Sequence, residues 1–368
     1  MVVNMWTPSG VRSADGPRNG SHNIVEPRLA TPPHTSRNSP NTENQEPVMR
    51  TRKPPLLVAI VSIPVLAALA TPTAADPDAT ATALSNAGEI VTQDNATPTS
   101  SSDGYTVETS NSTVTMPRQA SGDITVDDKD SDSSDIRIAL SGSSATAAES
   151  SPVGGIIYKD GDHSTTVLPK SDGSVQIATV IDSASSPSDY TYTFNGAEGS
   201  SFKMEDDGSV SLIGADGKWL GGIAAPWAKD ANGKNVPTSY SIDGNKLTQH
   251  VSFDSTTAFP IVADPWWAGN LIDHTEWADL WEWSPTLMVY PTLWGRTAGI
   301  GFRYAAWQET LDETERNGHP NPNTSSMKNQ FYCHWDAVRL WNPTKPSWNL
   351  DTKIPDRGLV GFLRNGCN

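Results

Sequence analysis

A cysteine and a histidine stand side by side near the end of the chain and carry the residue types best suited to chemistry. Cys333 and His334 lie in the segment 325–350, SSMKNQFYCHWDAVRLWNPTKPSWNL, among clustered tryptophans. An imidazole whose pKa is tuned by its surroundings can act as a general base when a carboxylate supports it. The candidate carboxylates are Glu309, Asp336 and Glu282. A pair such as His334 with Glu309 would suit a hydrolase.

The periodicity around His334 favours a structural role. Met327, Phe331, His334, Val338 and Trp341 recur at helical spacing, which places His334 in the middle of an apolar stripe. Thr324, Ser325 or Ser326 can cap this helix, and Asn342-Pro343 ends it. A histidine in such a stripe is more often a core residue than a catalyst, yet Gln330, one turn earlier, could orient the ring for catalysis. Both interpretations stay open on the sequence alone.

The two cysteines of the chain, Cys333 and Cys367, predict a disulfide. In an oxidising compartment a single pair most simply forms one bridge, which stabilises the fold by restricting the unfolded chain. The alternative is a reactive thiol at Cys333.

Other familiar reaction motifs are missing. The sequence has no HExxH, no paired CxxC and no GxSxG, so we expect no metal and no cofactor. An acidic run at Asp127, Asp128, Asp130, Asp132 and Asp135 resembles a calcium loop in charge. Ser133 and Ala139 stand where that loop needs glycine and glutamate, so we expect a solvated acidic loop instead.

Charge excludes one class of partner. The chain has 26 Lys+Arg against 42 Asp+Glu, a net charge of −16, and residues 76–368 hold twice as many acidic as basic side chains. Nucleic-acid binding needs a basic surface that contacts phosphates. We therefore expect no nucleic-acid partner.

The beginning of the chain is typical of an export signal. Basic Arg50, Arg52 and Lys53 precede an apolar run, 56–70, and small residues follow it. We expect residues 1–75 to be an extension and a signal peptide cleaved after Ala75, with translation starting near Met49. The alternatives are a genuine long extension and a retained anchor, but the run is short for a membrane span. The mature protein would be secreted, extracellular or associated with the cell wall, without a stable membrane span.

Composition divides the remainder into three parts. Residues 76–104, rich in Ala, Thr, Ser and Asp, predict a disordered spacer. Residues 105–264 alternate apolar and polar residues between Asp-Gly and Asn-Gly turns, which predicts an all-β, sandwich-like domain. Trp227, between two of these strands, could mark a ligand surface or close one end of the sandwich.

The last part, residues 265–368, holds ten of the thirteen tryptophans. A strand at 287–291, a glycine-punctuated loop with Arg296 and a helix over 300–316 are expected before the helix that carries His334. These features predict a small α+β domain with one disulfide. The overall fold class is therefore α+β.

Two stretches resemble known families. The segment 226–238 and the phrase FPIVADPWW at 259–267 resemble a β-rich module of secreted actinobacterial proteins. The phrases YPTLWGR, SMKNQFYCH, KPSWNL and a terminal CN resemble a small secreted actinobacterial domain family of unknown function, over about 271–368. The second resemblance implies these candidate positions: Arg296, Trp307, Gln330, Cys333, His334, Lys345, Trp348, Asn349 and Cys367.

Three functional hypotheses follow. The first is a binding module in which exposed tryptophans contact a cell-envelope component or another secreted protein. The second is a secreted hydrolase of envelope glycan or lipid that uses His334. The third is an antagonistic toxin domain that the β-rich module delivers.

Overall fold

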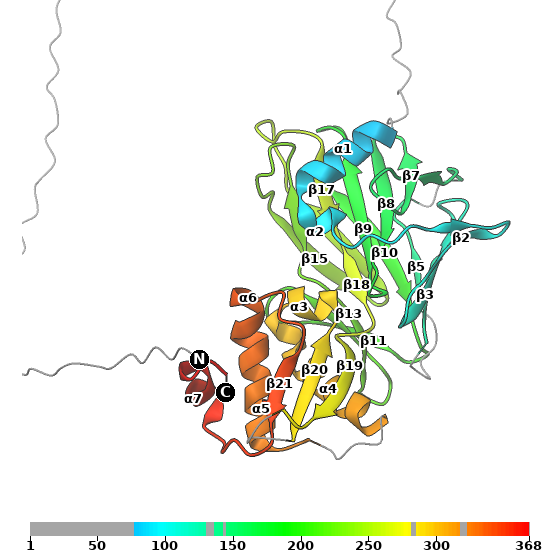
Figure 1. Cartoon of the computed structure of the whole chain (residues 1–368). Helices are drawn as coiled ribbons and strands as arrows, with labels where there is room; N and C mark the ends of the chain where they lie inside the picture. The colour runs from blue at the N-terminus through cyan, green and yellow to red at the C-terminus, as the bar shows by residue number, and fades with distance from the viewer. Residues whose placement is uncertain (1–76, 130–135, 143–144, 281–284, 317–321, 368) are drawn as a thin grey trace, which may run out of the picture. The chain divides into compact units, whose positions relative to one another are not determined.

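The computed structural model describes residues 77–129, 136–142, 145–280, 285–316 and 322–367 (Figure 1). The expected signal segment, most of the acidic run and Glu282 lie outside these ranges. Within the described ranges no helix is both long and apolar enough to cross a membrane.

Two antiparallel sheets dominate residues 99–268. Among the described residues, the first sheet has eight strands in the order β1 (Thr99–Ser100), β2 (Gly104–Glu108), β3 (Ser112–Pro117), β4 (Ile124–Asp128), β5 (Ile136–Ala139), β10 (Asp189–Asn195), β16 (Lys246–Val251) and β15 (Thr238–Asp243). Asp243 and Lys246 pair across Gly244-Asn245, so the last two strands form a tight hairpin.

The second sheet has ten strands within the described ranges. Its main order is β11 (Ser201–Met204), β12 (Val210–Ile213), β13 (Trp219–Ile223), β18 (Trp266–Ala268), β9 (Val175–Ile181), β8 (His163–Pro169), β7 (Ile156–Asp160) and β6 (Glu149–Ser150). Beside it, β14 (Trp227–Lys229) pairs with β17 (Ile261–Asp264), and β17 also pairs with β9. Both sheets contribute to one hydrophobic core, for example Ile138 and Tyr192 from the first and Ile177 and Trp267 from the second. The expected strand-rich antiparallel region is confirmed.

The expected disordered spacer contains two helices instead. Residues Pro77–Ala87 form α1 and Glu89–Thr92 form α2. Their small apolar stripe, which includes Leu84 and Val91, packs on the second sheet beside Val180 (Figure 1). The composition of this segment wrongly predicted disorder. Each alanine buries little surface, but alanines fit closely against a sheet. The helices depend on contact with a sheet that lies far away in the sequence.

Residues after 270 form the smaller α+β part. A three-stranded antiparallel sheet, β19 (Ile272–Ala278), β20 (Thr286–Pro291) and β21 (Trp348–Asp351), packs with α4 (Arg303–Arg316) and α5 (Ser325–Cys333). Shorter turns are α3 (Leu293–Thr297), a 3-10 turn (Ile300–Phe302), a π-helical turn (His334–Val338), α6 (Arg339–Trp341) and α7 (Gly358–Arg364). The helix expected over 300–316 is present, but Ile300 and Tyr304 are exposed rather than buried.

The expected boundary at 264/265 falls inside shared structure. Strand β18 lies after it, yet Trp266 and Trp267 pair with β9 of the large sheet. Trp267 belongs to the core between the sheets, whereas Trp266 packs in the C-terminal core with Trp294. The described residues accordingly belong to one compact unit.

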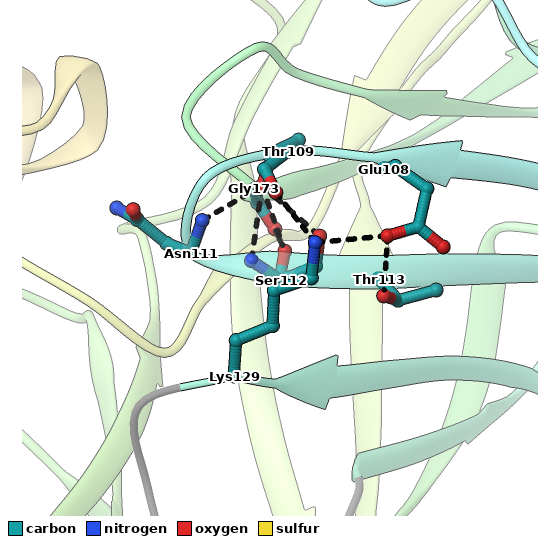
Figure 2. A network of polar contacts seen from close by, with 7 residues as sticks. All are labelled: Glu108, Thr109, Asn111, Ser112, Thr113, Lys129 and Gly173. Atoms are coloured by element: carbon teal, nitrogen blue, oxygen red, sulfur yellow. Dashed lines mark hydrogen bonds and ion pairs between the residues drawn. The ribbon is translucent and has the colours of Figure 1, made fainter.

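One turn connects three parts of this unit. The turn between β8 and β9 holds Asp172, Gly173 and Ser174: the Asp172 carboxylate accepts from the Trp294 backbone N–H (2.9 Å), and the Ser174 hydroxyl accepts from the Trp266 indole (2.9 Å). Figure 2 shows the third link, in which Ser112 of the β2–β3 hairpin donates to the Gly173 carbonyl (3.2 Å). This polar network joins the eight-stranded sheet, the ten-stranded sheet and α3.

Candidate functional site

The helix that carries His334 begins and ends largely as its sequence predicts. The Thr324 hydroxyl accepts from the Met327 N–H and caps α5, and Asn342 ends α6. Between them the helix changes to π-helical geometry from His334 to Val338. Such a bulge adds a residue to one turn and redirects the side chains after it, which explains why Trp341 points to solvent although its spacing matched the buried stripe.

His334 is buried beneath the loop that follows this helix. Its side chain is 1% exposed, and its Nδ1 donates to the Gln330 carbonyl, one turn earlier, at 2.9 Å. Because a carbonyl only accepts, Nε2 keeps its lone pair and faces the Lys345 ammonium at 3.2 Å. The expected role of Gln330 in orienting the ring is thus performed by its backbone.

Electrostatics keeps this histidine neutral. Burial, together with the charge of Lys345, lowers the pKa of His334 to about 3. Burial also lowers the pKa of Lys345, and the charge of Asp351 opposes that shift. A base with such a low pKa and so little exposure is poorly suited to take a proton from a substrate at neutral pH.

The Gln330 side chain ties the helix to β21. Its Nε2 donates to the Asp351 carbonyl (3.0 Å) and to the Ser326 hydroxyl (3.1 Å), and its Oε1 accepts from the Asp351 N–H (2.8 Å). All of these atoms are buried, so the amide satisfies backbone groups that would otherwise lack partners.

Arg296 holds the loop itself. Its guanidinium donates to the carbonyls of Lys345 (2.6 Å), Pro346 (2.7 Å) and Pro343 (3.4 Å). Partial burial lowers its pKa, but the pKa of arginine is so high that the side chain keeps its charge. Arg296, Gln330, His334 and Lys345 therefore do come together, as a brace under the 342–347 loop.

The remaining candidates fall into three groups. Trp307 and Trp348 lie in the core around Phe331, with ring centroids 5.5 Å and 5.6 Å from it. Asn349 lies on the other face of β21, where it accepts from the Ser347 hydroxyl at 2.8 Å. Cys333 and Cys367 form the predicted disulfide. Both half-cystines are buried, so the chain has no free thiol for the alternative chemistry.

The proposed carboxylate partners point elsewhere. The Glu309 carboxylate accepts from the backbone N–H groups of Leu271 (2.9 Å) and Ile272 (3.2 Å) at the start of β19. Asp336 forms an ion pair with Arg303 at 2.5 Å. Neither contacts His334. Within the described ranges no group of three or more His, Cys, Asp or Glu could hold a metal ion.

Comparison with known proteins finds a family to which the C-terminal part of the chain is similar. Residues 272–368 match the family model described as Protein of unknown function (DUF2599). We refer to this matched part of the chain as the DUF2599 domain, after the family that it resembles. An uncharacterized protein of Mycobacterium tuberculosis is 42% identical over 103 residues, which cover 27% of this chain and 66% of the relative. An uncharacterized protein of Mycobacterium leprae is 29% identical over 97 residues, 26% of this chain and 77% of the relative.

The chain thus covers slightly less than two thirds of the length of the M. tuberculosis relative. No solved structure matches the chain.

The DUF2599 domain exposes two adjacent large apolar side chains beside the brace. Leu340 is 74% exposed and Trp341 is 60% exposed, whereas Trp294, Trp307, Trp335 and Trp348 of the same domain are buried and Trp277 is half-buried. Arg339 precedes this pair and Lys345 follows it. We call Arg339, Leu340, Trp341 and Lys345 the α6 tip.

Contacts within the domain hold both cations of the tip, and Lys345 lies against Nε2 of His334 at 3.2 Å. Arg339 donates to the carbonyls of Trp335 and Ala298 and stacks over the Trp335 ring, 4.8 Å from its centroid. Such contacts fix the guanidinium without neutralising it. The DUF2599 domain therefore exposes two apolar side chains, and the half-buried cations Arg339 and Lys345 flank them in the sequence.

A second polar centre, outside the DUF2599 domain, was missed by the sequence reasoning. Burial raises the pKa of Asp264 to about 7 and lowers that of Lys170 to about 8. Asp264 accepts from the Gln176 amide (2.5 Å), and Lys170 donates to the Val91 carbonyl (2.9 Å) and Asn95 (2.6 Å). Asp264 lies in the distinctive FPIVADP phrase, which is the sequence feature that could have identified it. These contacts attach the α2 segment to the sheet and are structural.

Proposed function

We propose that this protein is an exported binding protein whose DUF2599 domain attaches to an anionic lipid surface of the cell envelope through the α6 tip. The observation that carries the proposal is the exposure of Leu340 and Trp341 between Arg339 and Lys345. Tryptophan favours the boundary between lipid and water, and each lysine or arginine near an anionic surface contributes about 1 kcal/mol.

The negative charge of the whole chain would make this tip the part that orients the protein on an anionic membrane. With a net charge of −16, most of the surface is repelled by an anionic membrane. The tip combines cations with apolar side chains and would therefore be the part that meets the lipid. The brace of Arg296, Gln330, His334 and Lys345 holds the loop that follows the tip, so less conformational entropy is lost on binding.

Two further features support export. Residues 50–75 have the basic, apolar and small-residue order of a signal peptide. The Cys333–Cys367 disulfide is typical of proteins in oxidising compartments. The resemblance of 226–267 to an export-linked module agrees with both.

The structure favours binding over the hydrolase based on His334. A catalytic base must reach the proton that it abstracts, and His334 is 1% exposed with a pKa of about 3. The broader tryptophan platform also loses support, because the buried tryptophans of the domain fill its core.

Vesicle sedimentation tests the proposal. The chain from Asp76 onward, which contains every described residue, is mixed with vesicles of phosphatidylglycerol and phosphatidylcholine. We expect retention on these vesicles and much weaker retention on phosphatidylcholine alone. The double variant Leu340→Ser/Trp341→Ser should reduce the affinity about tenfold or more, because burying each large apolar side chain contributes about 1.5–3 kcal/mol.

Val360→Ser is the matched control, since Val360 in α7 of the same domain is also 60% exposed. It should bind as the parent chain does. Equal loss in the control, or unchanged binding of the double variant, would refute the assignment to the tip. Retention on purified envelope glycan or on another secreted protein, with no retention on lipid, would replace lipid by that partner.

A further inference from the structure

Three polar side chains on the outer face of the eight-stranded sheet are arranged as a relay. The Ser241 hydroxyl lies 2.7 Å from Nε2 of His250, and Nδ1 of His250 lies 2.8 Å from Oδ1 of Asp189. Ser241 is on β15, His250 on β16 and Asp189 on β10, three adjacent strands. All three side chains are accessible to solvent.

The direction of the hydrogen bonds follows from the chemistry of the partners. An ionised carboxylate only accepts hydrogen bonds, so Nδ1 of His250 carries a hydrogen and donates to Asp189. In the neutral ring Nε2 then has a free lone pair, and the Ser241 hydroxyl donates to it. This polarity prepares a serine hydroxyl to lose its proton to histidine as it attacks a carbonyl carbon.

The sheet fixes this geometry. Asp189 is directly opposite His250, and Ser239 is opposite His250 on the other side. Ser241, two residues further along β15, approaches His250 diagonally, a distance that side chains on one face can span. β15 is an edge strand. Alternate N–H groups of an edge strand point away from the sheet and can donate to the oxygen of a tetrahedral intermediate.

A hollow lies at the Asp189 end of this relay, and Ser241 and His250 are not part of its wall. Its volume is about 560 Å³, and its wall includes Asp160, Asp162, Pro187, Asp189 and Tyr190. Asp189 thus belongs to both the relay and the hollow. The three carboxylates of this wall suit a positively charged group.

We propose that Ser241, His250 and Asp189 form a hydrolytic site for carboxylic esters, preferentially esters that carry a positive charge. The Ser241 oxygen bonds to the ester carbonyl carbon as its proton moves to Nε2 of His250. The carbon–oxygen bond to the alcohol then breaks, and the alcohol leaves with that proton. Water attacks the acyl-serine, His250 takes a proton from it and returns one to Ser241, and the carboxylic acid is released.

Asp189 acts as a positioning residue that holds the histidine tautomer. This site is separate from the α6 tip, so its test is independent of lipid binding.

Covalent labelling of the full chain tests the nucleophile. A fluorophosphonate probe reacts with serines activated by a base, and we expect one adduct, mapped to Ser241 by peptide mass. Ser241→Ala should abolish the adduct, and His250→Gln should reduce it about a hundredfold. Ser239→Ala is the matched control, because Ser239 is exposed on the same strand and face, and it should label as the parent does.

Hydrolysis measures the chemistry. The p-nitrophenyl esters of acetate and of lysine are compared in the same variants. We expect turnover that falls by about a hundredfold or more in Ser241→Ala and His250→Gln, and faster turnover of the lysine ester that is lost in Asp162→Asn. Labelling spread over several serines, or equal hydrolysis by the parent and Ser241→Ala, would overturn the catalytic site. Equal rates for both esters would overturn the preference for cations.

Discussion

Two histidines of this molecule show how the same side chain takes opposite roles. His334 is enclosed in a helix of the DUF2599 domain, 1% exposed, with a pKa of about 3. His250 lies on the open face of a sheet between a serine and an aspartate. Burial turns the first into a neutral packing and bracing group, whereas the second has both nitrogens engaged in a relay that solvent can reach. The histidine that stands beside a cysteine and several tryptophans in the sequence, His334, is the one less able to act as a base.

The largest expected contrast is in the response to acid. The pKa of His334 is about 3 in the folded protein, against 6.5 in the unfolded chain, so the unfolded state binds the proton more readily. The resulting stability is complete above pH 6.5 and is lost as the pH falls towards 3. We expect a decrease on the order of 4 kcal/mol over this interval, measured by urea unfolding followed by tryptophan fluorescence.

The variants separate this histidine from the other titrating groups. His334→Gln should flatten the decrease, while His250→Gln should keep it. If His334→Gln left the pH dependence unchanged, the acid sensitivity would belong to other groups and the buried, neutral state of His334 would be wrong.

A smaller effect is expected from Gln330, which braces the same region. Gln330→Leu leaves the buried N–H and carbonyl of Asp351 without their partners, which should reduce the free energy of unfolding by about 2–3 kcal/mol. Asn329→Leu is the comparison, since Asn329, the neighbouring residue, contacts Asp356 at the surface. It should lower stability by less than about 1 kcal/mol. Equal effects would mean that the buried amide is no more important than the surface one.

The smallest effect is expected at the relay. Because His250 and Asp189 are exposed, His250→Gln should change the free energy of unfolding by about 0.5 kcal/mol or less, in the same urea experiment. A loss above about 2 kcal/mol would identify the three side chains as a structural clamp of the sheet and would remove the contrast between the two histidines.

Local patterns in the sequence predicted much of the fold. Alternating residues and Asp-Gly turns gave the antiparallel sheets, and the turn at Gly244, with φ of 61°, is the left-handed conformation that glycine favours. The Thr324 cap and the Cys333–Cys367 bridge were also predictable, because a cap depends on adjacent residues and two cysteines allow one pairing. The spacer at 76–104 was the main error, since its helices exist through contact with a distant sheet.

The candidate site was predicted as a set of residues but not as an arrangement. Arg296, Gln330, His334 and Lys345 were all identified, and they do meet. His334 contacts a backbone carbonyl through one ring nitrogen and Lys345 through the other. This arrangement depends on how the 342–347 loop folds back over the helix. Helical spacing also placed Trp341 on the buried stripe, and the π-helical turn moved it to the surface.

The sequence by itself determined the elements, the disulfide and the acidic character of this protein, since these depend on neighbouring residues or on composition. The tertiary structure alone decided which histidine is buried and which is accessible. Asp189 and His250 are 61 residues apart in the chain and meet only through the pairing of β10 with β16. That register is set by the core shared between the two sheets, because a shift of one residue would turn Tyr190, Tyr192 and Phe194 out of it.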